Sequence, residues 1–199
     1  MANQWRISVD FWDRWKDLDH QFDLFATWQG VAGAGHFPDG DMIPFGHIGI
    51  KCTIAGKDRQ TRFTHDEQLT LMSLWSLNSS PLMLGNHLPD TDPWTLSLLT
   101  NDAVIALNQD HLAESAKRVY QQDRLEVWVK NLKDGSKAVG LFNRAKAAAT
   151  FFLIWSDAGL NARQSLRDLW AKKDLGDFNE TYSSSVPSHG VILLRCVPR

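Results

Sequence analysis

The spacing of hydrophobic positions changes once along the chain. Up to about residue 115, short apolar runs alternate with longer segments in which apolar side chains recur every three or four residues, as in amphipathic helices. The pattern predicts helices over residues 11–30, 66–78 and 102–108, a helix starting at Pro93, and short strands at residues 5–10, within 41–50 and at 81–85. Alternating strands and helices predict a parallel sheet with helical crossovers.

Two helix starts carry their own local signal. Thr64 and Glu67 have capping-box spacing, in which the Thr hydroxyl and the Glu carboxylate each satisfy a free backbone N–H. Pro93 suits the first position of a helix because its missing N–H costs nothing there.

After about residue 115 the pattern consists of strands only. Short runs rich in Val, Leu, Phe and Trp are separated by turn signals such as Asp134-Gly135. The runs are residues 118–121, 125–132, 137–143, 149–155, 165–168, 180–186 and 191–196. They predict an antiparallel Greek-key β-sandwich. The expected domains are therefore an α/β part at residues 1–115 and an all-β part at residues 116–199.

Composition narrows the classes of partner. The chain has 199 residues, with 43% hydrophobic residues, 22% charged residues and a formal net charge of -2. It can bury a core and has no electrostatic attraction to nucleic acid or an anionic membrane, so we expect a neutral partner. No apolar run reaches the roughly 20 residues that span a bilayer. Cys52 and Cys196 are too few for a disulfide framework or a metal site, and we expect two unpaired thiols.

Acidic residues stand where the first two strands give way to loops. Asp10 ends the run that begins at Trp5, and it is the first candidate for a catalytic carboxylate. Arg6 lies on the same face of that strand, so a structural salt bridge is the alternative reading. Asp39 and Asp41 also share a face, but two carboxylates without further oxygen ligands are a weak metal signal. We expect neither a metal nor a cofactor.

Several ordered motifs resemble glycoside hydrolase family 27, the retaining α-galactosidases and their relatives. They are Trp5-Arg6 followed by Asp10, His36-Phe37-Pro38-Asp39-Gly40-Asp41-Met42, Leu74-Trp75-Ser76-Leu77, Ser80-Pro81-Leu82-Met83-Leu84-Gly85, Leu98-Leu99-Thr100-Asn101, Val104 to Asp110, Arg167 to Trp170 and Val186 to Val191. Phe37 stands where the family usually has Trp. The resemblance spans nearly the whole chain. It implies the last three βα units of a (β/α)8 TIM barrel followed by the family's C-terminal β-sandwich.

The resemblance also implies roles for the acidic motifs. Asp10 corresponds to the general acid/base and Arg6 to a substrate-binding residue. Asp41 and Met42 would line the sugar pocket. Asp39 would belong to the substrate-binding group too, or would orient a neighbour or cap a loop. Trp5 would lie near the site. The implied substrate is an α-galactoside oligosaccharide or glycoconjugate, although relatives also act on α-N-acetylgalactosaminides or β-L-arabinopyranosides.

One part of the family's pattern is absent. The family's nucleophile is an Asp after a Lys on an earlier strand, for which there is no room before Trp5. We therefore expect the C-terminal part of a longer retaining glycosidase, inactive alone, whose barrel edge is covered by a missing N-terminal half or by self-association. The sequence does not indicate the cellular compartment.

The alternative is a noncatalytic carbohydrate-binding or scaffold protein that reuses the barrel remnant. In such a protein Trp128, Trp155 and Trp170 could form a flat sugar-binding platform.

Overall fold

The computed structural model describes residues 2–51, 56–161 and 163–199 of the chain. Its barrel-like part contains β1 (Gln4–Arg6), α1 (Trp15–Thr27), β2 (Phe37–Asp39), β3 (His47–Ile48), β4 (Arg59–Gln60), α2 (His65–Leu77), the 3-10 helix η1 (Leu88–Asp90), α3 (Pro93–Leu99) and α4 (Asp102–Asn108). The second part contains β5 (Lys117–Gln122), β6 (Leu125–Asn131), β7 (Lys137–Asn143), β8 (Ala149–Ile154), α5 (Trp155–Ala158), β9 (Gln164–Asp168), β10 (Lys173–Phe178), β11 (Thr181–Val186) and β12 (Val191–Pro198).

The barrel part contains a parallel pair of strands joined by a helical crossover, and a separate short antiparallel pair formed by β3 and β4. β1 pairs with β2 in parallel, with Arg6 opposite Asp39. The expected strand at residues 81–85 is only an extended segment, joined to the chain by one parallel bridge between Ile43 and Leu84. Leu84 is 42% exposed and its neighbour Met83 is 59% exposed, because nothing in the described chain covers this edge. These units form part of a (β/α)8 barrel.

The helices follow the predicted pattern with one shifted start. α1 begins at Trp15 rather than Phe11, because the preceding loop is held by Asp13, whose buried carboxylate bonds Arg59 and the backbone N–H of Arg62. The capping box of α2 is present: Glu67 N donates to Thr64 Oγ1 and Thr64 N donates to the Glu67 carboxylate. α3 begins at Pro93 and α4 spans Asp102–Asn108, as predicted.

The second part is an antiparallel sandwich, as predicted. Its large sheet has the strand order β10-β9-β12-β7-β6-β5, and β11 pairs with β8 in a small sheet. Side chains of Phe151 and Leu153 on β8 pack against Val139, Leu141 and other residues of the large sheet. β10 was not predicted, because its sequence is mostly polar and contains Gly176 at a register shift.

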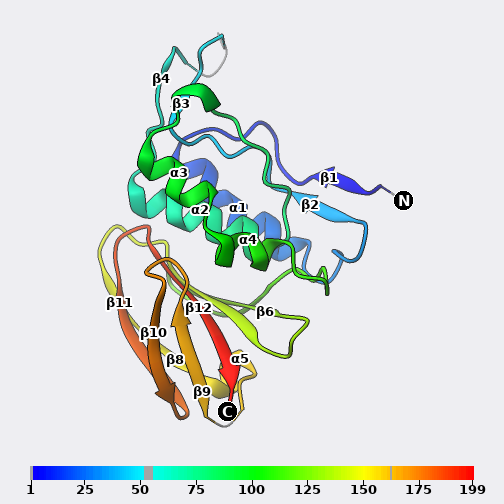
Figure 1. The fold of residues 1–199 in the computed structure, drawn as a ribbon, viewed down its shortest axis with the longest axis vertical. Helices are drawn as coiled ribbons and strands as arrows, with labels where there is room; N and C mark the ends of the chain where they lie inside the picture. The colour runs from blue at the N-terminus through cyan, green and yellow to red at the C-terminus, as the bar shows by residue number, and fades with distance from the viewer. Residues whose placement is uncertain (1, 52–55, 162) are drawn as a thin grey trace.

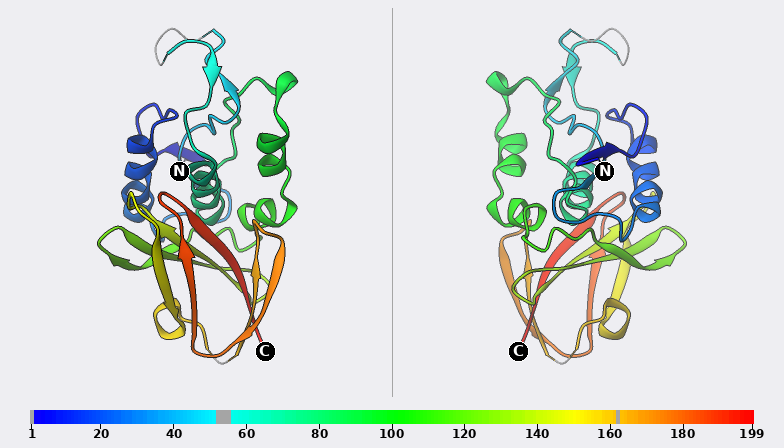
Figure 2. Two further views of the ribbon diagram at one scale, coloured as in Figure 1. Left: turned by 90° about the vertical axis from the view of Figure 1, so that its left-hand side faces the viewer. Right: turned by 90° about the vertical axis from the view of Figure 1, so that its right-hand side faces the viewer.

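The other face of the large sheet carries the helices (Figure 1). α2 lies centrally, with α1 on one side and α3 and α4 on the other (Figure 2). α2 is buried nearly all round, including its polar side chains from Gln68 to Ser76. Its Trp75 and Leu77 share a core with Trp128, Phe142 and Leu193 of the sheet. The two parts are thus fused through one hydrophobic core. Their division near residue 115 stays a prediction.

Three smaller expectations can be compared with the structure. Within the described residues, no helix is long and apolar enough to cross a membrane. Cys196 is a free, buried thiol, and burial raises its pKa to about 12. Cys52 lies outside the described residues. Trp128 is buried between the large sheet and the helices, and Trp155 is buried inside the sandwich, so a platform built from them is not present.

A buried lysine lies in the core between the two parts. Lys130 Nζ donates to Ser79 Oγ at 2.7 Å, to Leu107 O at 2.6 Å and to Ser76 O at 3.3 Å. Desolvation by burial lowers the pKa of Lys130 from 10.5 to about 8, with the carboxylates of Asp110 and Glu114 acting in the opposite direction.

This pKa makes stability depend on alkaline pH. Between about pH 8 and 10.5 the unfolded chain binds the Lys130 proton more than the folded chain does, so the free energy of unfolding rises with pH. We expect Lys130 to contribute a rise of about 1 kcal/mol between pH 7 and 9, from a total of about 3 kcal/mol. Urea unfolding across that range measures it.

The contribution is the difference between the wild type and Lys130→Met, because other groups titrate equally in both. Lys133→Met, at an exposed position of the same region, serves as the control and should leave the pH profile unchanged. Parallel profiles for the wild type and Lys130→Met would show that Lys130 is solvated normally.

Candidate active site

The ends of β1 and β2 bring the predicted acidic residues together. The strands are parallel, and Ile7 N donates to Asp39 O at 3.0 Å, which continues the pairing beyond Arg6. The loops that follow both strands therefore leave the sheet at the same end, where the carboxyl ends of the strands lie. In open sheets built from βα units, functional side chains gather at this end.

Arg6 joins two of the predicted site residues. Its Nη1 and Nη2 both donate to Asp10 Oδ1 at 3.2 Å, and its Nη2 lies 2.9 Å from Asp41 Oδ2. The alternative reading of a salt bridge between Arg6 and Asp10 therefore describes a real contact. The contact does not exclude a catalytic role, because the Asp10 side chain is 77% exposed.

Asp41 is held in place much more firmly than Asp10. Its Oδ2 accepts a hydrogen bond from Phe11 N and its Oδ1 one from Met42 N, both at 2.8 Å. The residue adopts a left-handed backbone with φ 80°, and its carbonyl accepts a bond from Trp75 Nε1 at 3.0 Å. Asp41 is thus a fixed carboxylate that orients Arg6 and the start of the loop after Asp10.

Asp39 supports this arrangement from inside the protein. It is 6% exposed, its Oδ1 accepts a bond from Asp41 N at 2.8 Å, and its Oδ2 accepts one from Gln4 Nε2 at 2.5 Å. This geometry fits the orienting function considered for it above. A direct contact between Asp39 and substrate stays a prediction.

Gly40 allows the loop between the two acidic residues to pack tightly. A Cβ at this position would lie 2.7 Å from the Trp75 ring and 2.9 Å from Phe25. Its backbone N–H donates to Ser80 Oγ at 2.9 Å, which links the loop to the segment before the barrel edge. The Gly in the Asp-Gly-Asp motif is therefore required by close approach.

Trp5 and Met42 lie beside this group. The Trp5 ring packs against Trp28 at a centroid distance of 5.4 Å and against His36 at 6.5 Å, and it is half-buried. Met42 is half-buried, and its side chain lies against Gly85 on the neighbouring segment. Their roles in binding sugar stay predictions.

A small cavity opens beside the exposed carboxylate. It has a volume of about 120 Å³ and is lined by Ser8, Val9, Asp10, Phe11, Lys16, Asp17, His20 and Gln21. Gln21 Nε2 donates to Ser8 Oγ at 3.0 Å and to Gly40 O at 3.2 Å, so it ties α1 to both acidic loops. Asp10 is accessible from this side.

Four further polar residues gather on the loops around β3 and η1. His47 and His87 both contact the carboxylate of Asp90, and His47 also contacts Asp58. The sequence pattern did not indicate this group, because 39 residues or more separate His47 from His87 and Asp90 and no zinc-motif spacing connects them.

Family models match nearly the whole chain. Residues 1–110 match the family described as "Alpha galactosidase A", and residues 122–196 match the "Alpha galactosidase C-terminal beta sandwich domain". The first match covers more than half of the chain. The position of the second agrees with the predicted C-terminal sandwich.

Similar proteins are glycosidases by name. A probable α-galactosidase of Dictyostelium discoideum is 35% identical over 204 residues, covering 100% of this chain and 50% of that protein. The GH27 β-L-arabinopyranosidase of Geobacillus stearothermophilus is 41% identical with a TM-score of 0.94, covering 99% of this chain and 45% of the solved chain. A variant of that enzyme was solved in complex with arabinose, with a TM-score of 0.95 to this chain.

The chain spans about half the length of the relatives it matches. Its fold, family matches and structural neighbours agree on the same portion of the same enzymes. This chain belongs to glycoside hydrolase family 27, the α-galactosidase family, and corresponds to the last barrel units and the C-terminal β-sandwich of that family's fold.

Proposed function

We propose that this chain is the C-terminal part of a retaining glycosidase that cleaves terminal α-galactosides, with Asp10 as its general acid/base. The observation that carries the proposal is the convergence of Arg6, Asp10 and Asp41 at the carboxyl ends of two parallel strands. Family membership supports the reaction class.

The three residues differ in how tightly their side chains are hydrogen-bonded, and each has a different proposed role. Asp41 has both carboxylate oxygens bonded to backbone N–H groups, so it anchors the Arg6 guanidinium. The bonds that reach Asp10 arrive at Oδ1, and the exposed carboxyl group can protonate a leaving oxygen and later activate water. Arg6 can turn its remaining N–H donors toward sugar hydroxyls.

A retaining mechanism needs a second carboxylate about 5–5.5 Å from Asp10 to attack the anomeric carbon. We propose that it comes from another segment of barrel, which packs against the open edge. Met83 and Leu84 support this idea, since they are 59% and 42% exposed at that edge. A TIM barrel would bury such positions by closing.

We also propose that the chain divides into two domains, residues 1–115 and residues 116–199.

A chimera tests the function directly. The part of the Geobacillus β-L-arabinopyranosidase that this chain does not match would be fused in front of Asn3. We expect the chimera to hydrolyse aryl α-galactosides or aryl β-L-arabinopyranosides, and neither piece alone to do so. NMR of the first-formed sugar should show retention of configuration.

The outcomes separate the competing readings. A folded chimera that binds galactose or arabinose but cleaves neither glycoside would favour the noncatalytic alternative. Hydrolysis by this chain alone would show that a complete site assembles without another segment. The relative rates on galactosides, N-acetylgalactosaminides and arabinopyranosides would define the sugar.

A further inference from the structure

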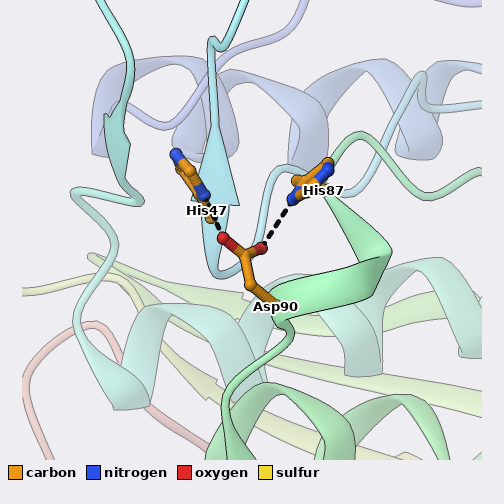
Figure 3. A group of neighbouring side chains, drawn as sticks. All are labelled: His47, His87 and Asp90. Atoms are coloured by element: carbon orange, nitrogen blue, oxygen red, sulfur yellow. Dashed lines mark hydrogen bonds and ion pairs between the residues drawn. The ribbon is translucent and has the colours of Figure 1, made fainter.

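Three potential metal ligands lie together where β3 approaches η1: His47 on β3, His87 just before η1 and Asp90 on η1 (Figure 3). His47 Nδ1 lies 2.6 Å from Asp90 Oδ2, and His87 Nδ1 lies 2.9 Å from Asp90 Oδ1. One ligand atom from each residue lies within 4.8 Å of the other two. None of the three takes part in the contacts that join Arg6, Asp10 and Asp41.

The second nitrogen of His47 shows how the ring is held. His47 Nε2 lies 2.5 Å from Asp58 Oδ1, on the side of the ring away from Asp90. A histidine that binds a metal through one nitrogen commonly donates its other N–H to a carboxylate, which fixes the tautomer and the ring orientation. Asp58 is placed to do this for His47.

The group is accessible and has the chemistry of a zinc site. A cavity of about 390 Å³ is lined by His47, His87, Gly85 and Asn86, among other residues. Two imidazoles and a carboxylate are a known Zn²⁺ ligand set, with water as the fourth ligand. Zn²⁺ prefers ligand atoms roughly 3.3 Å apart, so the side chains would separate by roughly half an ångström. His87 and Asp90 are exposed and free to adjust.

We propose that His47, His87 and Asp90 bind one Zn²⁺ ion, with Asp58 orienting His47. The ion would join the β3–β4 pair to η1, two segments that are distant in sequence. Its role would be to stabilise these two loops.

Zinc titration of the chelator-treated chain tests the proposal. We expect calorimetry to show one site, and a zinc concentration 100 times the Kd to raise the Tm by roughly 5–10 °C. Magnesium should have no effect because it requires oxygen ligands. Cobalt substitution should give ligand-field bands without a thiolate charge-transfer band.

Variants separate ligands from their surroundings. His47→Ala and His87→Ala should each abolish the zinc-dependent rise in Tm, whereas His111→Ala, at an exposed site outside the group, should retain it. Asp58→Asn should weaken zinc binding by about 10–100-fold without abolishing it.

Folding of each variant is checked by circular dichroism without zinc. His87 is 44% exposed, so His87→Ala should keep the fold. No zinc-dependent heat or Tm shift in the wild type would overturn the proposal. An equal shift in the wild type, His47→Ala and His87→Ala would do the same, by placing the ion elsewhere.

Discussion

Replacing Asp10 with Asn should lower the kcat of the active chimera by about 10²–10⁴-fold for substrates with a poor leaving group, because the amide cannot donate the proton. Arg6 and Asp41 remain paired in this variant, so substrate binding should change little. The measurement is hydrolysis of a series of glycosides whose leaving groups differ in pKa.

The leaving-group dependence distinguishes an acid/base from a positioning residue. A nitrophenolate that leaves without protonation should form the glycosyl-enzyme almost as fast in Asp10→Asn as in the unmodified chimera. Azide should then restore turnover, since a small anion needs no general base. A uniform loss across the series, without azide rescue, would contradict the assignment.

Asp17→Asn is the matched control. Asp17 lines the same cavity as Asp10, but its carboxylate pairs with Arg14 at 2.7 Å on the first turn of α1. It does not touch Arg6 or Asp41 in the structure, and its replacement should leave kcat within about a factor of two.

Local signals in the sequence predicted the elements well where each residue's role is set by its near neighbours. The capping box at Thr64 and the proline at the start of α3 depend on contacts within one helical turn, and both were predicted. The start of α1 was not, because it depends on Asp13, whose partners lie about 46 to 49 residues away.

The candidate site shows the same distinction. Alternation along a strand expected at residues 5–10 predicted Arg6 and Asp10 on one face. The two residues are in contact, although β1 ends at Arg6 and Asp10 lies in the loop that follows it. Because β1 and β2 are parallel neighbours, Asp41, which follows β2, also reaches Arg6. Adjacent parallel strands in the predicted order are consistent with this contact. The group of His47, His87 and Asp90 depends on the path of two loops, which hydrophobic periodicity does not encode.

Arg144 connects the two parts of the molecule through a buried network of charges. Its Nη1 bonds Glu126 Oε1, and its Nε donates to Asp19 Oδ1 at 2.7 Å on α1. The guanidinium also lies over the Phe22 ring, 4.9 Å from its centroid. The Glu126 side chain is fully buried and that of Arg144 is 5% exposed.

Arg144→Met should therefore lower the free energy of unfolding by about 3–5 kcal/mol, because it leaves the Glu126 carboxylate buried with less compensation. Arg118 still pairs with Glu126, since its Nη1 lies 3.2 Å from Glu126 Oε1, so we expect a loss of stability near the lower end of this range. Urea unfolding followed by tryptophan fluorescence measures the change.

Arg124→Met is the control, since Arg124 pairs with the same Asp19 at 2.6 Å but is 46% exposed. It should cost no more than about 1 kcal/mol. The double variant Glu126→Gln with Arg144→Met should be more stable than Arg144→Met alone, because the amide removes the uncompensated charge while its oxygen still accepts the Trp128 Nε1 bond. Equal losses for Arg144→Met and Arg124→Met would mean that the helices and the sandwich are joined by apolar packing, with no net contribution from the buried charges.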